Sequence, residues 1–196
     1  MGFLQMNHIH NSTISGSVTE APGTESWIER LADSLYHTHD LTRGFELGGR
    51  LFPLYARYAS MSERYVGSRK INLWRAEEYE HMLAAPQESF TAKDVEALRR
   101  FAEEEMEPAL VPREKGRTVP PKDHMRTYLT LVVPCRTPVT NETAAKIRRF
   151  RFEKSYLFSL RGYCQTRLVV LDLQAQKVYV SRDARNLYDF FERMLI

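Results

Sequence analysis

The chain has 196 residues, of which 43% are hydrophobic and 27% are charged. This is ordinary globular composition, and it excludes a wholly disordered or fibrous chain. Two cysteines, Cys135 and Cys164, are too few for a disulfide framework or a cysteine zinc site, and we expect both to be buried apolar groups. The longest apolar run, Leu168–Leu171, is too short to span a bilayer, so we expect a soluble cytoplasmic protein without a membrane partner.

The net charge of +3 is unevenly distributed along the chain. Residues 1–110 carry a net charge of −6 and residues 111–196 one of +9, with seven basic residues and one acidic residue in Lys146–Arg167. Such sorting is found in proteins that bind a polyanion and in folds whose two halves attract each other. Attraction between the two halves of one fold is the commoner cause, and we favour it.

Residues 1–24 have no lysine or arginine and no apolar core of a signal peptide, which predicts a mobile tail before one domain at residues 25–196. Helical spacing of Trp27, Leu31 and Leu35 predicts a helix from Glu25 to His37. Ser26, with Glu29 three positions later, has the form of a capping box at its start.

Gly48-Gly49 predicts a two-residue hairpin turn, because both glycines tolerate positive φ. In the strand that follows, alternation places Phe52, Leu54 and Ala56 on one face, and Pro53 indicates a sheet edge or a bulge. The next strand is predicted at Tyr65–Trp74. Residues 79–83 fit a strand, with Tyr79, His81 and Leu83 on one face, nearly as well as a helical turn.

Thr91 begins a predicted helix with one apolar side, and Pro108 and Pro112 are expected to close it. The loop at residues 111–126, with three prolines and five basic residues, is the candidate sub-boundary within the domain.

The carboxyl-terminal half predicts a central strand at Tyr128–Val133, a helix at Glu142–Arg148 after Thr140, and strands at Tyr163–Leu173 and Lys177–Ser181. A last helix is expected to dock through four apolar residues, Leu187, Phe190, Phe191 and Met194. The fold class predicted from these elements is α+β, with a mostly antiparallel sheet and helices packed on at least one face.

Between Arg149 and Gly162 a two-residue alternation predicts one long strand, and Gly162 allows a turn or bulge after it. Its aromatic face has two interpretations: a stripe packed under a helix, or a platform that stacks nucleic-acid bases beside basic residues. Core packing is the commoner explanation. That stripe consists of Phe150, Phe152, Tyr156, Phe158 and Leu160.

The nucleic-acid interpretation would use basic side chains of this segment and of the preceding loop. Its candidate residues are Lys146, Arg149, Arg151, Arg113 and Lys115.

Two His-x-His pairs, His37/His39 and His8/His10, raise the question of a metal site. Residues two apart share a face only on a strand, and His37 and His39 fall at a predicted helix end, where the helix dipole alone favours histidine. A metal-assisted hydrolase that adds His81 and His124 is a third alternative. Neither a nucleophile elbow nor a phosphate or dinucleotide loop occurs in the sequence, so we assign no catalytic residue and expect no cofactor.

Two stretches resemble an uncharacterised family of bacterial proteins known as a domain of unknown function. One is PKDHMRTYLT from Pro121, which runs on to Val133; the other is RFRFEKSYLF from Arg149, continued by Arg161-Gly-Tyr, Arg167-Leu-Val-Val-Leu-Asp and Lys177-Val-Tyr-Val. The hairpin at Gly48-Gly49 and Arg64-Tyr65 extend the likeness over about Phe45–Asn186. The resemblance implies a bacterial cytoplasmic protein and transfers no catalytic residue.

The function predicted from the sequence is a non-enzymatic binding or interaction module of a bacterial cytoplasm. Its partner is unidentified, and a protein partner or a second copy of the chain is a candidate. The alternatives are a nucleic-acid-binding protein and, third, the metal-assisted hydrolase.

Overall fold

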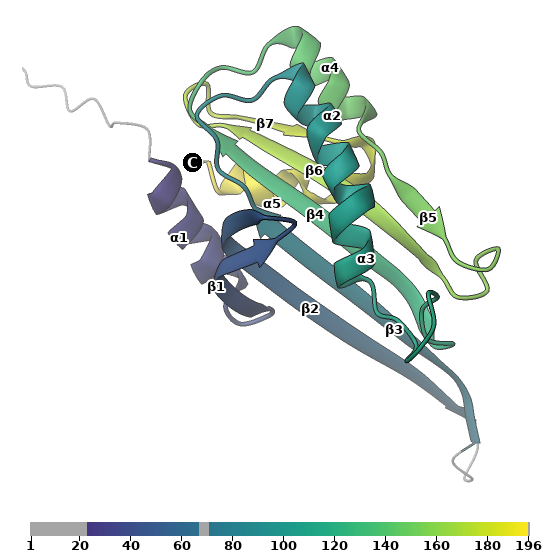
Figure 1. Cartoon of the computed structure of the whole chain (residues 1–196). Helices are drawn as coiled ribbons and strands as arrows, with labels where there is room; N and C mark the ends of the chain where they lie inside the picture. The colour runs from purple at the N-terminus through teal and green to yellow at the C-terminus, as the bar shows by residue number, and fades with distance from the viewer. Residues whose placement is uncertain (1–22, 67–70, 196) are drawn as a thin grey trace, which may run out of the picture.

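The computed structural model of the chain describes residues 23–66 and 71–195. The tail predicted for residues 1–24, and His8 and His10 with it, therefore lies outside the described residues except for Gly23 and Thr24. In the described part of the chain, seven strands form one sheet that has helices on both faces (Figure 1). The strands are β1 (Asp40–Leu47), β2 (Arg50–Val66), β3 (Ile71–Ala84), β4 (His124–Cys135), β5 (Glu153–Ser155), β6 (Tyr163–Asp172) and β7 (Lys177–Val180).

The α+β class is confirmed, but the sheet is mixed, and the prediction of a mostly antiparallel sheet is wrong. The strand order is β1-β2-β3-β4-β6-β5, and β7 also pairs with β6. β4 pairs in parallel with both of its neighbours, β3 and β6, whereas the outer pairs are antiparallel. Parallel neighbours need long crossovers, and here the crossovers are residues 85–123 and 136–162, which contain helices. Strands from before and after the loop at 111–126 thus share one sheet.

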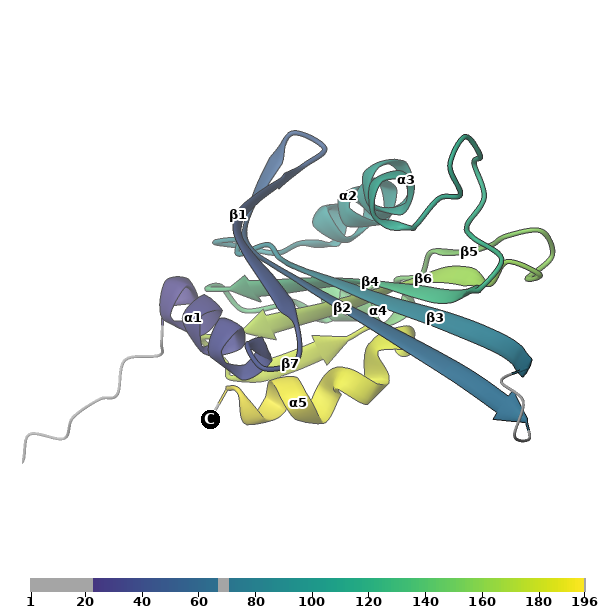
Figure 2. The ribbon, with the colours of Figure 1, turned by 90° about the horizontal axis from the view of Figure 1, so that it is seen from below.

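Each face of the sheet carries its own apolar core. The helices are α1 (Thr24–Leu35), α2 (Ala92–Phe101), α3 (Glu107–Leu110), α4 (Asn141–Arg149) and α5 (Tyr188–Arg193), with a π-helical turn at Ala102–Met106 and a 3-10 turn at Arg182–Leu187. Figure 2 shows α2 and α3 on one side of the sheet and α1 and α5 on the other. Within the described ranges, none of these helices is long and apolar enough to cross a membrane.

Alternate residues of the central strands enter opposite cores. Leu131 and Leu168 pack beneath α2 and α4, while Val132 and Val169 pack against α1 and α5. This burial on both sides confirms the central strand predicted at Tyr128–Val133.

Helix α1 begins and ends earlier than predicted, and the expected capping box is absent. Gly23 is the N-cap residue, and the Ser26 hydroxyl donates a hydrogen bond to the Gly23 carbonyl at 3.2 Å. Because the helix already begins at Thr24, Ser26 lies inside the first turn and cannot cap it. The predicted apolar side is correct, since Trp27 and Leu31 are fully buried.

The hairpin turn at Gly48-Gly49 is confirmed, with φ values of 54° and 69° and with Leu47 paired to Arg50. The predicted common face of Phe52, Leu54 and Ala56 is wrong. Phe52 belongs to one core, and Leu54 and Ala56 belong to the other.

The change of face coincides with an interruption of the strand ladder. The pairing between β1 and β2 skips Gly44 and Pro53. Gly44 has a positive φ of 65°, and Pro53, opposite it, has no backbone N–H to donate. On the next strand the ambiguity at residues 79–83 resolves in favour of β3, which places His81 and Leu83 toward the core beneath α2.

Helix α2 begins at Thr91 as predicted, and Thr91 and Asp94 form a capping box there. Of the two prolines expected to close the helix, Pro108 does not, because the helical path continues through the π turn into α3. That path ends at Leu110, before Pro112. Proline is tolerated near the start of a helical segment, where a missing N–H leaves no internal bond unmade.

The long strand predicted between Arg149 and Gly162 does not form. β5 contains three residues, and residues 157–159 all have positive φ, which ends the strand in a tight turn. The aromatic stripe is therefore split. Phe150 and Tyr156 are buried and Phe152 half-buried, but Phe158 is 101% exposed and Leu160 80% exposed.

The remaining carboxyl-terminal predictions are confirmed. Thr140 caps α4 by accepting a hydrogen bond from the Thr143 amide at 3.2 Å. β6 and β7 occupy the two predicted strand positions, and both cysteines are fully buried. The last helical segment docks through Phe191, which stacks on Trp27 with ring centroids 6.1 Å apart.

The split stripe predicts opposite effects for two identical substitutions. Phe150→Ala should lower the free energy of unfolding by about 3–5 kcal/mol, because it leaves a cavity in the core. Phe158→Ala should change it by less than about 0.5 kcal/mol, because the ring is exposed. Urea unfolding of both variants in dilute solution measures the two values. Equal losses for the two variants would contradict the exposure of Phe158.

Candidate functional site

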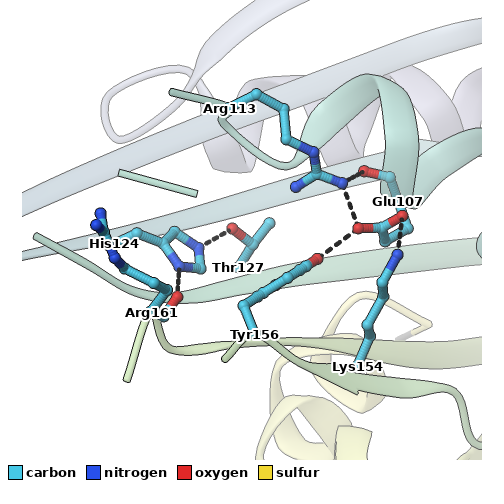
Figure 3. Close-up of polar contacts among 7 residues, drawn as sticks. All are labelled: Glu107, Arg113, His124, Thr127, Lys154, Tyr156 and Arg161. Atoms are coloured by element: carbon cyan, nitrogen blue, oxygen red, sulfur yellow. Dashed lines mark hydrogen bonds and ion pairs between the residues drawn. The ribbon is translucent and has the colours of Figure 1, made fainter. Parts of the chain in front are cut away.

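A buried carboxylate lies where the π turn joins α3. Glu107 is 2% exposed, and three side chains donate hydrogen bonds to it (Figure 3). The Tyr156 hydroxyl donates to Oε1 at 2.6 Å, Lys154 Nζ donates to Oε2 at 3.0 Å, and Arg113 forms a close ion pair with Oε1. We call these four residues the Glu107 clamp.

The π turn explains why this carboxylate points inward. The Glu107 amide donates to the Ala102 carbonyl five residues earlier, so the extra residue in the turn places Glu107 beneath buried Ala102. The preceding acids Glu103, Glu104 and Glu105 remain exposed. The clamp thereby joins the first crossover, which holds Glu107 and Arg113, to the second, which holds Lys154 and Tyr156.

The electrostatics of the clamp keep its protons fixed. Burial by itself would raise the pKa of Glu107, but hydrogen bonds from Tyr156, Lys154 and Arg113 lower it below its ordinary value. Burial and the bond to Glu107 raise the pKa of the Tyr156 hydroxyl. At neutral pH the carboxylate is therefore ionised and Tyr156 is a permanent donor.

His124 lies beside the clamp at the start of β4, and it is 3% exposed. Its Nδ1 lies 2.8 Å from the Arg161 carbonyl, which only accepts, so this nitrogen carries the proton. Its Nε2 then accepts from the Thr127 hydroxyl at 2.8 Å. Burial lowers the pKa of His124, so the ring is neutral and both nitrogens are occupied (Figure 3).

The turn at residues 156–162, which we call the apolar loop, projects from this polar cluster. Leu157, Phe158 and Ser159 adopt φ values of 49°, 54° and 70°, a left-handed turn that costs about 1–2 kcal/mol per residue. Four backbone hydrogen bonds hold the turn. Two join its ends, from the Tyr156 amide to the Gly162 carbonyl and from the Arg161 amide to the Tyr156 carbonyl, and two lie within it, from the Leu160 amide to the Leu157 carbonyl and from the Gly162 amide to the Ser159 carbonyl.

Both ends of the apolar loop are fixed to the body of the protein. Tyr156 is held by Glu107, and the Arg161 carbonyl is held by His124. Gly162, with φ 72°, passes so close to β4 that an added Cβ would lie 2.1 Å from the Met125 carbonyl oxygen. The loop therefore presents its apolar side chains on a rigid base, with Leu157 50% exposed and Phe158 completely exposed.

A pocket of about 350 Å³ opens beside the apolar loop. Leu160 and Gly162 of the loop line it together with Met125, Lys122 and Asp123. Arg161 links the apolar loop to the preceding loop by donating to the Pro120 carbonyl at 3.4 Å.

The histidines proposed as metal ligands do not gather at one place. His37 is exposed after the end of α1, and His39 Nδ1 lies 2.8 Å from the Thr38 hydroxyl. His81 lies on β3, apart from His124, and its Nδ1 is 2.7 Å from the Tyr55 hydroxyl. Among the described residues, no three His, Cys, Asp or Glu side chains are grouped so that they could hold a metal ion.

The residues proposed for nucleic-acid binding are also separated, and several are paired within the chain. Lys146 and Arg149 line a small pocket on α4 beside α2. Lys115 lies on the loop after α3, where Arg113 is bound to Glu107. Lys146 pairs with Glu96 at 3.2 Å, and Arg151 pairs with Glu153 at 2.8 Å and with Asp183 at 3.7 Å.

Sequence reasoning missed Glu107, because it saw only an acidic run at the carboxyl end of the helix, unfavourable to the helix dipole, and gave none of its residues a role. One available signal was the pair Glu107-Pro108, since a proline inside a helical pattern indicates an irregular turn. The apolar loop was missed because alternation of aromatic residues outweighed the turn residues Ser159 and Gly162.

The close approach of Gly162 predicts a severe effect of one methyl group. Gly162→Ala should lower the free energy of unfolding by on the order of 4 kcal/mol or more, because backbone atoms of β4 occupy the space. Gly116→Ala is the matched control: its φ is 74°, and no atom lies within 4 Å of the added Cβ. It should cost only the left-handed penalty of about 1–2 kcal/mol. Denaturant unfolding compares them, and equal costs would refute the close approach.

The clamp predicts a pH-dependent stability. At pH 7, Glu107→Gln should cost about 3–5 kcal/mol, because Arg113 loses its buried counter-ion. Folding lowers the pKa of Glu107. Its contribution to the free energy of unfolding is therefore complete above the unfolded-state pKa of about 4.3, and it disappears as the pH falls through the lower folded-state pKa.

Urea unfolding between about pH 3 and pH 7 tests this dependence. The stability difference between wild type and Glu107→Gln should shrink toward the acid end. The exposed neighbour Glu104→Gln serves as the control and should differ little from wild type throughout. A difference for Glu107→Gln that stays constant over this range would contradict the stabilised carboxylate.

Comparison with known proteins yields a family but no activity. No curated protein and no solved structure matches the chain. The model of a domain of unknown function, DUF8052, matches residues 23–193, which span the sheet and all the helices described above. This confirms the resemblance to an uncharacterised family. The chain therefore belongs to the DUF8052 family.

Proposed function

We propose that this protein is a non-enzymatic interaction module of a bacterial cytoplasm and that it contacts a protein partner through the apolar loop. The observation that carries the proposal is a fully exposed Phe158 at the tip of a turn whose two ends are anchored in buried polar contacts. The bacterial and cytoplasmic setting rests on the family resemblance and on the composition of the chain.

The exposure of this loop differs from the scattered apolar residues of an ordinary surface. Leu157, Phe158 and Leu160 fall within four residues, and each is at least half exposed. Burying one such side chain contributes about 1.5–3 kcal/mol, so a partner that covers all three gains a useful part of a binding free energy. The turn adds specificity, because its left-handed backbone fixes where the side chains point.

The polar cluster supports a structural role better than acid–base catalysis. Glu107 has its oxygens occupied by three donors, and His124 has both ring nitrogens bonded. Burial, with a smaller contribution from Arg57, lowers the pKa of His81 to about 4, so this ring is also neutral. Glu107 and His124, held in this way, position the apolar loop, and the hydrogen bonds that hold them occupy the atoms that acid–base catalysis would use.

Site-specific photo-crosslinking in living cells tests the proposal. A photoreactive phenylalanine analogue at position 158 should form one discrete protein adduct. The same analogue at Tyr36, which is 69% exposed at the end of α1, is the control and should form none. The adduct at position 158 should disappear when Leu157 and Leu160 are replaced by Ser. The absence of an adduct at position 158 would refute the contact surface.

A further inference from the structure

The apolar loop and the pocket beside it form a projection and a recess on the same surface. Phe158 lies one and two residues from Ser159 and Leu160, which line the pocket of about 350 Å³. We infer that a second copy of this chain docks here, with the Phe158 of each copy seated in the pocket of the other. This inference rests on the proposed function and names its partner.

The pocket has the chemistry to accept an aromatic ring. Met125, Leu160 and Tyr163 supply apolar lining, and Met125 is itself 46% exposed. A methionine sulfur beside an aromatic ring is a favourable contact, and a flexible methionine adapts to the shape of the ring. Phe158 cannot fill the pocket of its own chain, because its backbone has φ 54° and its ring is completely exposed.

A two-fold arrangement would let both copies use projection and recess at once. An axis beside the apolar loop brings each Phe158 to the other copy's pocket at once, so the contact is self-complementary and closed. The rim supports the same pairing by charge. Lys122 and Asp123 are adjacent and opposite in sign, and an antiparallel partner can oppose each lysine with the partner's Asp123.

Sedimentation velocity of the purified full-length protein over a range of concentrations tests the dimer. Wild type should dimerise, and Phe158→Ala should raise the dimer dissociation constant at least about tenfold, as expected for a central aromatic anchor. Met125→Lys, which places a charge in the recess, should do the same. Tyr36→Ala removes another exposed aromatic side chain, 69% exposed, and should leave the constant unchanged. Thermal unfolding checks that each variant is folded.

Mixing the two weakened variants gives the sharpest readout. A Phe158→Ala copy keeps its recess and a Met125→Lys copy keeps its projection, so one complete contact forms only between them. Fluorescence energy transfer between differently labelled variants should therefore detect a mixed dimer that is weaker than wild type and stronger than either variant with itself.

Three results would overturn the inference: a wild-type chain that is monomeric at about 100 μM, a dimer unaffected by Phe158→Ala, or a mixture with no mixed dimer. The crosslinking result separates this failure from failure of the proposed function. An adduct at position 158 with the mass of two chains supports the second copy, and an adduct with another mass assigns the apolar loop to a different protein. No adduct refutes both.

Discussion

The contact between the Glu107 carboxylate and its three donors determines how one end of the molecule is organised. A buried carboxylate without partners is costly, whereas here Arg113, Lys154 and Tyr156 satisfy it from two different crossovers. The π turn supplies the position, and the donors supply the charge and hydrogen bonds. Neither crossover alone contains a complete set of partners.

The same contact explains how three consecutive residues can stay in a left-handed turn. Such a turn is unfavourable for residues other than glycine, so its ends must be held by the surrounding structure. Tyr156 on one side is fixed by Glu107, and Gly162 on the other lies against β4. Polar contacts inside the protein therefore determine which apolar side chains are presented outside it.

The sequence predicted most elements whose evidence is local, although the capping box expected at Ser26 is absent, and it missed those that depend on distant contacts. The Gly48-Gly49 hairpin and the helix after Thr140 are specified by neighbouring residues, and both were predicted correctly. The parallel pairing of β4 with β3 and β6 depends on how two long crossovers return, which a strand pattern does not encode. Phe158 alternates like a core residue, and its exposure follows from a turn that its own pattern does not signal. Glu107 was missed for a similar reason, since the π turn that buries it depends on packing.

The parallel centre of the sheet has a consequence for folding kinetics. β4 cannot gain its two neighbours until both crossovers have closed, and such non-local closure is slow. The Glu107 clamp joins those crossovers, so it is complete only when both are in place. We therefore expect the clamp to act mainly on the unfolding rate, prolonging the lifetime of the native state more than it hastens folding.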